Sequence, residues 1–174
     1  MNIVECGVPS ASALGREVIE SAYFCDSYSA PLTRPDLAIA DIYAAIFAHP
    51  PLTMKLLLIV RNAIVRPLGL RAPPAGQIMR PELKGRYAVG EKVGLWSIFF
   101  IDENEIIAGA DDRHQDFRVS VLRVHAAGGA ASVIVSTICT VHNLFGKIYL
   151  FFIVPYHRHG VKTLLRNAVA AGRL

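Results

Sequence analysis

The sequence predicts an α+β fold, with an antiparallel sheet of about six strands, two helices inserted after the first strand, and a C-terminal helix packed on the sheet. Two observations predict it. Residues 90–157 hold β-branched and aromatic runs separated by short turn sequences. On either side of that stretch, apolar residues recur at the three- and four-residue spacing of helices. The 174 residues are predicted to form one domain, 1–174.

The N-terminal part begins with weakly patterned residues 1–20, which we expect to be a weakly structured extension. Residues 21–31 contain a predicted first strand that ends at Pro31. The run Thr33-Arg-Pro-Asp predicts the start of a helix, with the Thr33 hydroxyl as its cap. That helix has an apolar face of Ile39, Ile42, Tyr43, Ile46 and Phe47.

A second helix is predicted from Leu52 to about Leu68, with Lys55, Asn62 and Arg66 on one narrow face and apolar residues over the rest. Such a wide apolar stripe packs against both the sheet and the first helix, or part of it meets a ligand, a lipid surface or another subunit. Residues 69–86, rich in Pro and Gly, are predicted to be a long connection.

The predicted sheet continues with strands at 93–101 and 105–111, and then with a strand in which Phe117, Val119 and Val121 alternate with polar residues. Residues 132–142 and 147–154 are predicted to pair as a hairpin around 143–146. Both faces of this hairpin are apolar, so helices or a partner subunit of a homo-oligomer must cover at least one of them. A terminal helix follows at about 160–171.

The chemistry of the chain excludes several classes of protein. Cys6, Cys25 and Cys139 show no disulfide or metal-ligand spacing, which favours a reducing cytoplasm and no metal. The first residues lack the pattern of a signal peptide. The longest apolar run, Leu52–Val65, is too short and too polar to span a bilayer, so we expect no transmembrane segment. Scattered basic residues without an aromatic platform argue against nucleic acid.

The net charge of +4 is divided into blocks. Residues 102–116 carry one Arg and six acids, whereas residues 117–174 carry seven bases and no acid. Such segments often neutralise one another across the folded surface. The alternative is a basic face for an anionic head group or a membrane surface.

The candidate site residues each have a second interpretation. Asp111, Asp112 and His114 suit acid–base chemistry or a cation, or else form a solvated turn. On the predicted hairpin, His142 and Tyr149 share a face with Thr140, where they would orient a ligand or pass a proton, or simply bond to backbone and solvent. The remaining candidates are Arg118 and Trp96. Arg118 would anchor an anion if its side chain faces inward, and would pair with the acidic residues of 102–116 if it faces outward. Trp96 also suits a place in the core.

Four motifs carry a family resemblance: GEKVGLW (90–96), GADDRHQDFRVS (109–120), VHNLFGKIYL (141–150) and IVPYHR (153–158). They resemble a family of bacterial domains of unknown function, number 2867, which is grouped with the START-like helix-grip superfamily of lipid-transfer domains, polyketide cyclases and birch-pollen-allergen-like proteins. The resemblance implies a curved sheet that grips a helix around an apolar cavity. The predicted terminal helix is shorter than the gripping helix of that superfamily, and no Gly-rich fingerprint implies a cofactor.

The functional hypothesis is the binding of an apolar or amphipathic small molecule in a cavity between the sheet and the C-terminal helix. Its candidate ligand-binding residues are Trp96, Asp112, His114, Arg118, His142 and Tyr149. One alternative is a cyclase, hydratase or isomerase on the same fold, in which His142, Tyr149 or the Asp111/Asp112 pair moves protons. The other is an interaction module that docks a partner or a membrane through the helix predicted from Leu52 to Leu68.

Overall fold

The computed structural model describes residues 3–68, 72–79, 84, 86–125 and 129–174. Within them one sheet has the strand order β1-β2-β7-β6-β5-β4-β3, and all neighbouring strands are antiparallel. The strands are β1 Val4–Glu5, β2 Phe24–Leu32, β3 Lys92–Val93, β4 Trp96–Ile101, β5 Glu105–Asp111, β6 Gln115–His125 and β7 Ala131–Val141. The predicted α+β class, antiparallel sheet and C-terminal helix are therefore confirmed, with seven strands instead of about six.

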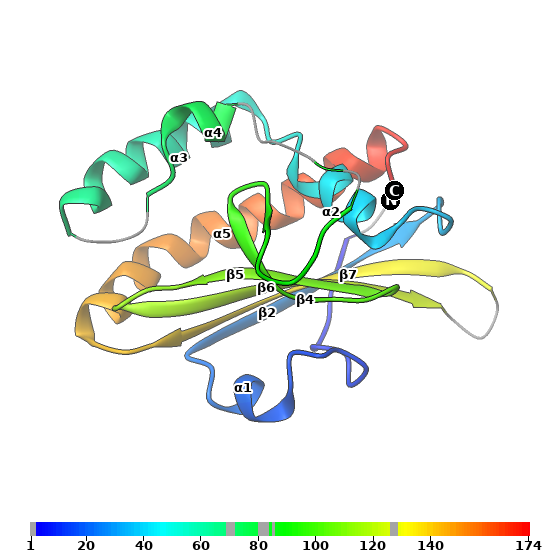
Figure 1. Cartoon of the computed structure of the whole chain (residues 1–174), viewed down its shortest axis with the longest axis horizontal. Coiled ribbons are helices and arrows are strands. Elements are labelled where there is room, and N and C mark those ends of the chain that lie inside the picture. The colour runs from blue at the N-terminus through cyan, green and yellow to red at the C-terminus, as the bar shows by residue number, and fades with distance from the viewer. Residues whose placement is uncertain (1–2, 69–71, 80–83, 85, 126–128) are drawn as a thin grey trace.

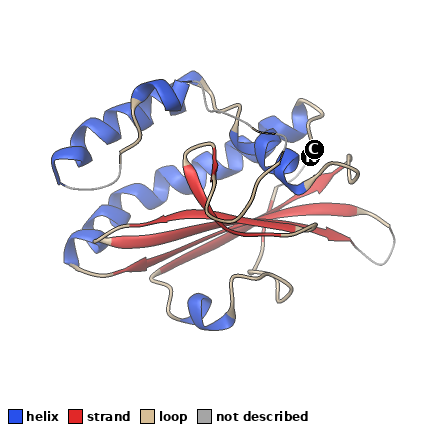
Figure 2. Ribbon diagram, in the orientation of Figure 1, coloured by secondary structure: helices blue, strands red, loops and turns tan. Residues whose placement is uncertain are grey.

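The helices lie on both faces of this sheet but in unequal numbers (Figures 1 and 2). One face carries α2, α3, α4 and α5, and the opposite face carries the short α1. Their bounds are α1 Arg16–Glu20, α2 Ile39–Phe47, α3 Leu52–Val65, α4 Ala75–Met79 and α5 Leu144–Ala170, with a 3-10 turn η1 at Arg66–Leu68.

The main core lies between the sheet and the helices α2 and α5. It forms because alternate residues of the strands point to one face. Tyr28 of β2, Val121 of β6 and Val135 of β7 are aligned across the sheet and fully buried. Ile42 of α2 and Leu165 of α5, also fully buried, belong to the same cluster. The predicted apolar faces of the first helix and of the β6 strand are confirmed.

The predicted hairpin of residues 132–142 and 147–154 is wrong in its second half. Residues 147–154 belong to α5, a helix of 27 residues that continues through Pro155. Asn143 begins it, because the Asn143 side chain accepts a hydrogen bond from the Gly146 amide at 3.1 Å. The β-branched and aromatic run suits a buried strand, but here Phe151 and Phe152 are exposed on a helix. The terminal helix is consequently much longer than the predicted 160–171.

Smaller corrections concern the N-terminal half. The predicted extension 1–20 contributes β1, which pairs with Tyr28 and Ser29 of β2, and also α1. Thr33 does not cap a helix: α2 begins at Ile39, and the Thr33 hydroxyl donates to the carbonyl of Leu174. The predicted connection 69–86 contains α4, while 69–71, 80–83 and 85 lie outside the described residues.

No single helix among the described residues is long and apolar enough to cross a membrane. The helices α2 and α3 meet that test only when taken together, and they are bent by 85° relative to each other.

A buried carboxylate fastens the N-terminal segment to the opposite face of the sheet. Glu105 of β5 is 1% exposed. It accepts hydrogen bonds from the Ser12 hydroxyl at 2.5 Å, the Ala13 amide at 2.7 Å and the Ser120 hydroxyl at 2.5 Å. Three donors compensate for the burial of the acid. Beside it, Leu14 packs with Ile107 and Ile138 in a small second cluster.

We expect Glu105→Ala to lower the free energy of unfolding by about 3 kcal/mol, because the buried Ser120 hydroxyl and two part-buried donors lose a common acceptor. Urea unfolding measures the loss. Glu103→Ala is the matched control, since Glu103 lies exposed in the preceding turn. Equal stability of the two variants would contradict the role given to Glu105.

Candidate ligand-binding site

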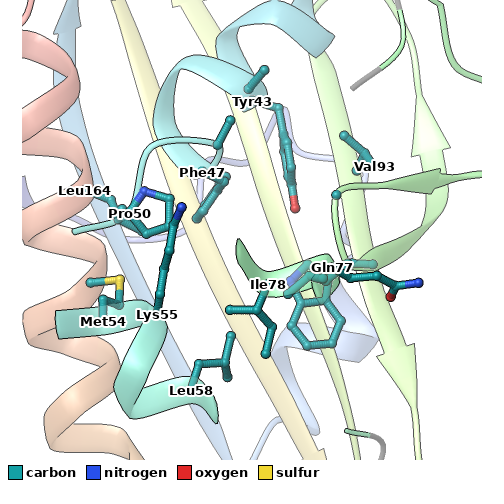
Figure 3. A pocket seen from close by; sticks show the side chains of 15 residues that line it. Tyr43, Phe47, Pro50, Met54, Lys55, Leu58, Gln77, Ile78, Val93 and Leu164 are labelled. Carbon is teal, nitrogen blue, oxygen red and sulfur yellow. The ribbon is translucent and has the colours of Figure 1, made fainter. Parts of the chain in front are cut away.

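A cavity of about 160 Å³ lies where α2, α3 and α4 meet the turn between β3 and β4 (Figure 3). Nearly all the groups around it are apolar. The C-terminal helix α5 contributes Leu164 to it. The side chains labelled in Figure 3 are Tyr43, Phe47, Pro50, Met54, Lys55, Leu58, Gln77, Ile78, Val93 and Leu164.

The helix α2 positions one wall. Its Tyr43 and Phe47 lie one turn apart and pack with ring centroids 4.7 Å apart. Tyr43 is 3% exposed, and Figure 3 shows its hydroxyl directed toward the cavity. Burial raises the pKa of Tyr43, and nearby Tyr87 adds to the effect. The hydroxyl is therefore a neutral group at physiological pH, able to donate or accept a hydrogen bond.

The helices α3 and α4 supply the polar margin. Lys55 comes from the narrow polar face of α3, and its Nζ donates to the carbonyl of Met79 at the end of α4 at 3.1 Å. Gln77 of α4 also lines the cavity. An ammonium group has three donors, so Lys55 keeps capacity for a second acceptor. The cavity thus combines an apolar interior with a cation at its edge.

Of the six candidate residues, Trp96 is the one that lines this cavity. It also packs edge-to-face on Phe117, with ring centroids 4.7 Å apart. Arg118 lies on the opposite face of the sheet. Its guanidinium contacts Asp111 at 2.6 Å and stacks 3.5 Å above the ring centroid of Phe99. The interpretation in which Arg118 pairs with the acidic block matches this placement.

Three further candidates gather around the turn between β5 and β6, where α5 begins. His114 is buried, contacts the Asn143 side-chain amide within 3.3 Å, and packs on Phe145 at 4.6 Å between ring centroids. His142 Nε2 lies 3.0 Å from Asp116 Oδ2. The Asp112 amide donates to the carboxylate of Asp116 at 3.1 Å. These contacts hold the turn against the start of the helix.

Tyr149 does not share a sheet face with His142 and Thr140, because it lies on α5. Its hydroxyl accepts hydrogen bonds from Arg61 Nε at 2.8 Å and Arg61 Nη2 at 2.5 Å. Burial raises the pKa of Tyr149 and outweighs the lowering effect of Arg61. The neutral phenol and the guanidinium therefore join α3 to α5.

A polar cluster under α5 was not among the sequence candidates. Asp26 of β2 has a side chain only 2% exposed, and its Oδ1 lies 3.4 Å from His157 Nε2. The same ring nitrogen is 3.1 Å from the Thr137 hydroxyl, and Tyr28 donates to Asp26 Oδ2 at 3.1 Å. Its one sequence signal is an acid within the predicted first strand, residues 21–31. These side chains do not line the cavity.

The described residues contain no group of three His, Cys, Asp or Glu side chains that could hold a metal ion. His159, which the sequence places beside His157, is exposed on α5.

Comparison with known proteins identifies one family. A family model described as a protein of unknown function (DUF2867) matches residues 18–164. No curated protein and no solved structure matches the chain.

The burial of Cys139 predicts its reactivity. Burial, with the nearby Asp26 carboxylate adding to it, raises the pKa of the Cys139 thiol to about 12. Thiolate is the reactive form, so at neutral pH we expect a thiol reagent to label exposed Cys25 well before Cys139. Peptide mass mapping during labelling measures the order. Labelling of Cys25 and Cys139 at the same rate in the folded protein would contradict the burial of Cys139.

Removing the Tyr149 hydroxyl is expected to loosen α3. Tyr149→Phe takes the acceptor from Arg61, and we expect the free energy of unfolding to fall by about 1–3 kcal/mol. Hydrogen exchange should accelerate in the amides of α3. The control is Tyr156→Phe, because Tyr156 lies on the same helix and is 63% exposed. Unchanged exchange in α3 for Tyr149→Phe would rule out this link.

Proposed function

The chain belongs to this family of unknown function, and we propose that it binds a small amphipathic molecule whose apolar end enters the cavity between α2, α3 and α4. One observation carries the proposal. The cavity is apolar inside and has Lys55 at its margin, a combination that suits a molecule with an apolar end and a polar or anionic head.

The volume of the cavity limits the size of the group that can enter it. About 160 Å³ is close to the size of engineered apolar cavities that bind benzene, and is below the usual range for drug-sized ligands. The cavity therefore accepts one ring or a short stretch of alkyl chain. Burying a group of that size contributes about 1.5–3 kcal/mol, which alone gives a dissociation constant weaker than millimolar. Useful affinity then depends on the polar head.

The residues at the margin favour a carboxylate or a similar anion as that head. Lys55 can donate a charge-assisted hydrogen bond to it while keeping its bond to Met79. The neutral Tyr43 hydroxyl, which Figure 3 shows directed toward the cavity, suits an uncharged oxygen of the ligand. Both residues lie on the helices inserted between β2 and β3, so the inserted helices supply specificity, and α5 supplies part of the apolar wall.

The proposal includes a START-like helix-grip domain in the cytoplasm. Support for the fold comes from the layer of helices on an antiparallel sheet and from the length of α5. Support for the compartment comes from Cys6, Cys25 and Cys139, which are all free thiols. The cyclase-type enzyme has less support, because Tyr149 bonds Arg61, Asp111 pairs with Arg118 and His142 contacts Asp116, and none of these side chains lines the cavity.

Trp96 provides the direct test, since it is the one tryptophan of the chain and it lines the cavity. We expect titration with hexanoate or octanoate to change its fluorescence in a saturable manner. Lys55→Gln should weaken binding by about tenfold or more, because an anion loses its charged donor. Lys92→Gln is the control, with an exposed Lys outside the cavity.

A second variant tests the cavity itself. Ala48 lines it, so Ala48→Leu should fill part of the space and abolish the fluorescence response while the far-ultraviolet circular dichroism stays unchanged. Saturable binding that neither Lys55→Gln nor Ala48→Leu alters would place the ligand elsewhere, and the absence of any response would contradict the proposal.

A further inference from the structure

The two helices α3 and α5 expose an unusual amount of apolar surface. They lie side by side and antiparallel (Figure 1), since Arg61 bonds Tyr149 and Met54 lies beside Gly160. On α3 the exposed apolar residues are Leu52, Leu56, Leu57, Val60 and Ile64. On α5 they are Leu144, Ile148, Phe151, Phe152 and Tyr156. We call these ten residues the exposed apolar face.

The exposed fractions of these side chains are large for apolar residues. Phe151 is 75% exposed, and every member of the face is about half exposed or more. Soluble monomers rarely expose a contiguous apolar patch beyond a few hundred Å² unless something binds there. This face is separate from the cavity. The residues of α3 that line the cavity are Met54, Lys55 and Leu58, and none of the ten residues of the exposed apolar face lines it.

The helices that carry the face hold charges of one sign. The helix α3, the turn η1 and the helix α5 contain two, one and four Lys or Arg residues, seven in all, and no Asp or Glu. Lys147 lies over the ring of Tyr23 at 5.8 Å, and Arg158 lies over that of Phe24 at 5.5 Å. Lys162 is 3.4 Å from Glu5 of β1, so Lys147 and Arg158 are the better placed to meet an external anion.

We propose that the exposed apolar face docks on an anionic lipid bilayer. Helices with Phe and Leu on an exposed face and Lys or Arg beside it lie in the boundary between head groups and acyl chains. Tyr and basic side chains suit the head-group level. A second copy of the chain fits less well, because a two-fold dimer would bring the basic residues of α3 and α5 close to their own copies.

The test is co-sedimentation of the full chain with phosphatidylcholine vesicles that contain or lack phosphatidylserine. Binding is expected with phosphatidylserine, and it should weaken as the salt concentration rises. The double variant Lys147→Gln/Arg158→Gln should bind roughly 25-fold more weakly, at about fivefold per charge. Phe151→Ser/Phe152→Ser should also lose binding, with an unchanged melting temperature because both rings are exposed.

The matched controls lie on α1, on the other side of the sheet, where Arg16→Gln and Val18→Ser should bind vesicles like the parent protein. Failure to bind anionic vesicles would overturn the proposal, as would equal binding to vesicles without phosphatidylserine. A dimer in sedimentation velocity that Phe151→Ser/Phe152→Ser dissociates, without vesicle binding, would assign the face to a second copy. The Trp96 titration is independent of each of these results.

Discussion

The contact between Gly146 and the turn that precedes β6 determines where the longest helix lies. A Cβ atom at Gly146 would be 2.4 Å from the carbonyl oxygen of His114, so a glycine is needed there. Asn143 caps the helix at the same point and also bonds the backbone of Arg113. With its beginning held at that edge, α5 crosses the sheet and brings Leu164 to the cavity and Tyr149 to α3. The cavity and the exposed apolar face both depend on this placement.

Polar contacts hold α3 more than apolar packing does. Of its 14 residues, Asn62 and Val65 are buried. Asn62 donates to the carbonyl of Pro73 at 2.8 Å, and Arg61 and Lys55 reach α5 and α4. A helix held in this way can shift without breaking the main core. It forms a wall of the cavity on one side and half of the exposed apolar face on another, so movement of α3 would affect both.

Sequence patterns predicted the strands from β4 to β7 closely, because period-two alternation reflects one buried face. They fail at residues 147–154, where a run that suits a buried strand forms a helix with Phe151 in water. Residues 143–146 suit a hairpin loop as well as a helix start, so the cap at Asn143 cannot be told apart from a turn by pattern alone. Trp96 was the candidate that reached the cavity. The pairing of Asp26 with His157 has no local signal, since it joins residues far apart in the chain.

Pro155 divides α5 into two parts with different stability. Proline has no backbone N–H, so the carbonyl of Phe151 loses its usual partner in the helix. Before Pro155 the buried residues are Gly146 and Leu150, whereas after it they are Val161, Leu164, Leu165, Ala168 and Val169. The first part can therefore open at a lower free energy while the second stays in the core. The part before Pro155 also holds Phe151, the most exposed aromatic side chain of the described residues, so the residues of α5 that the core holds least are those that present most apolar surface to water.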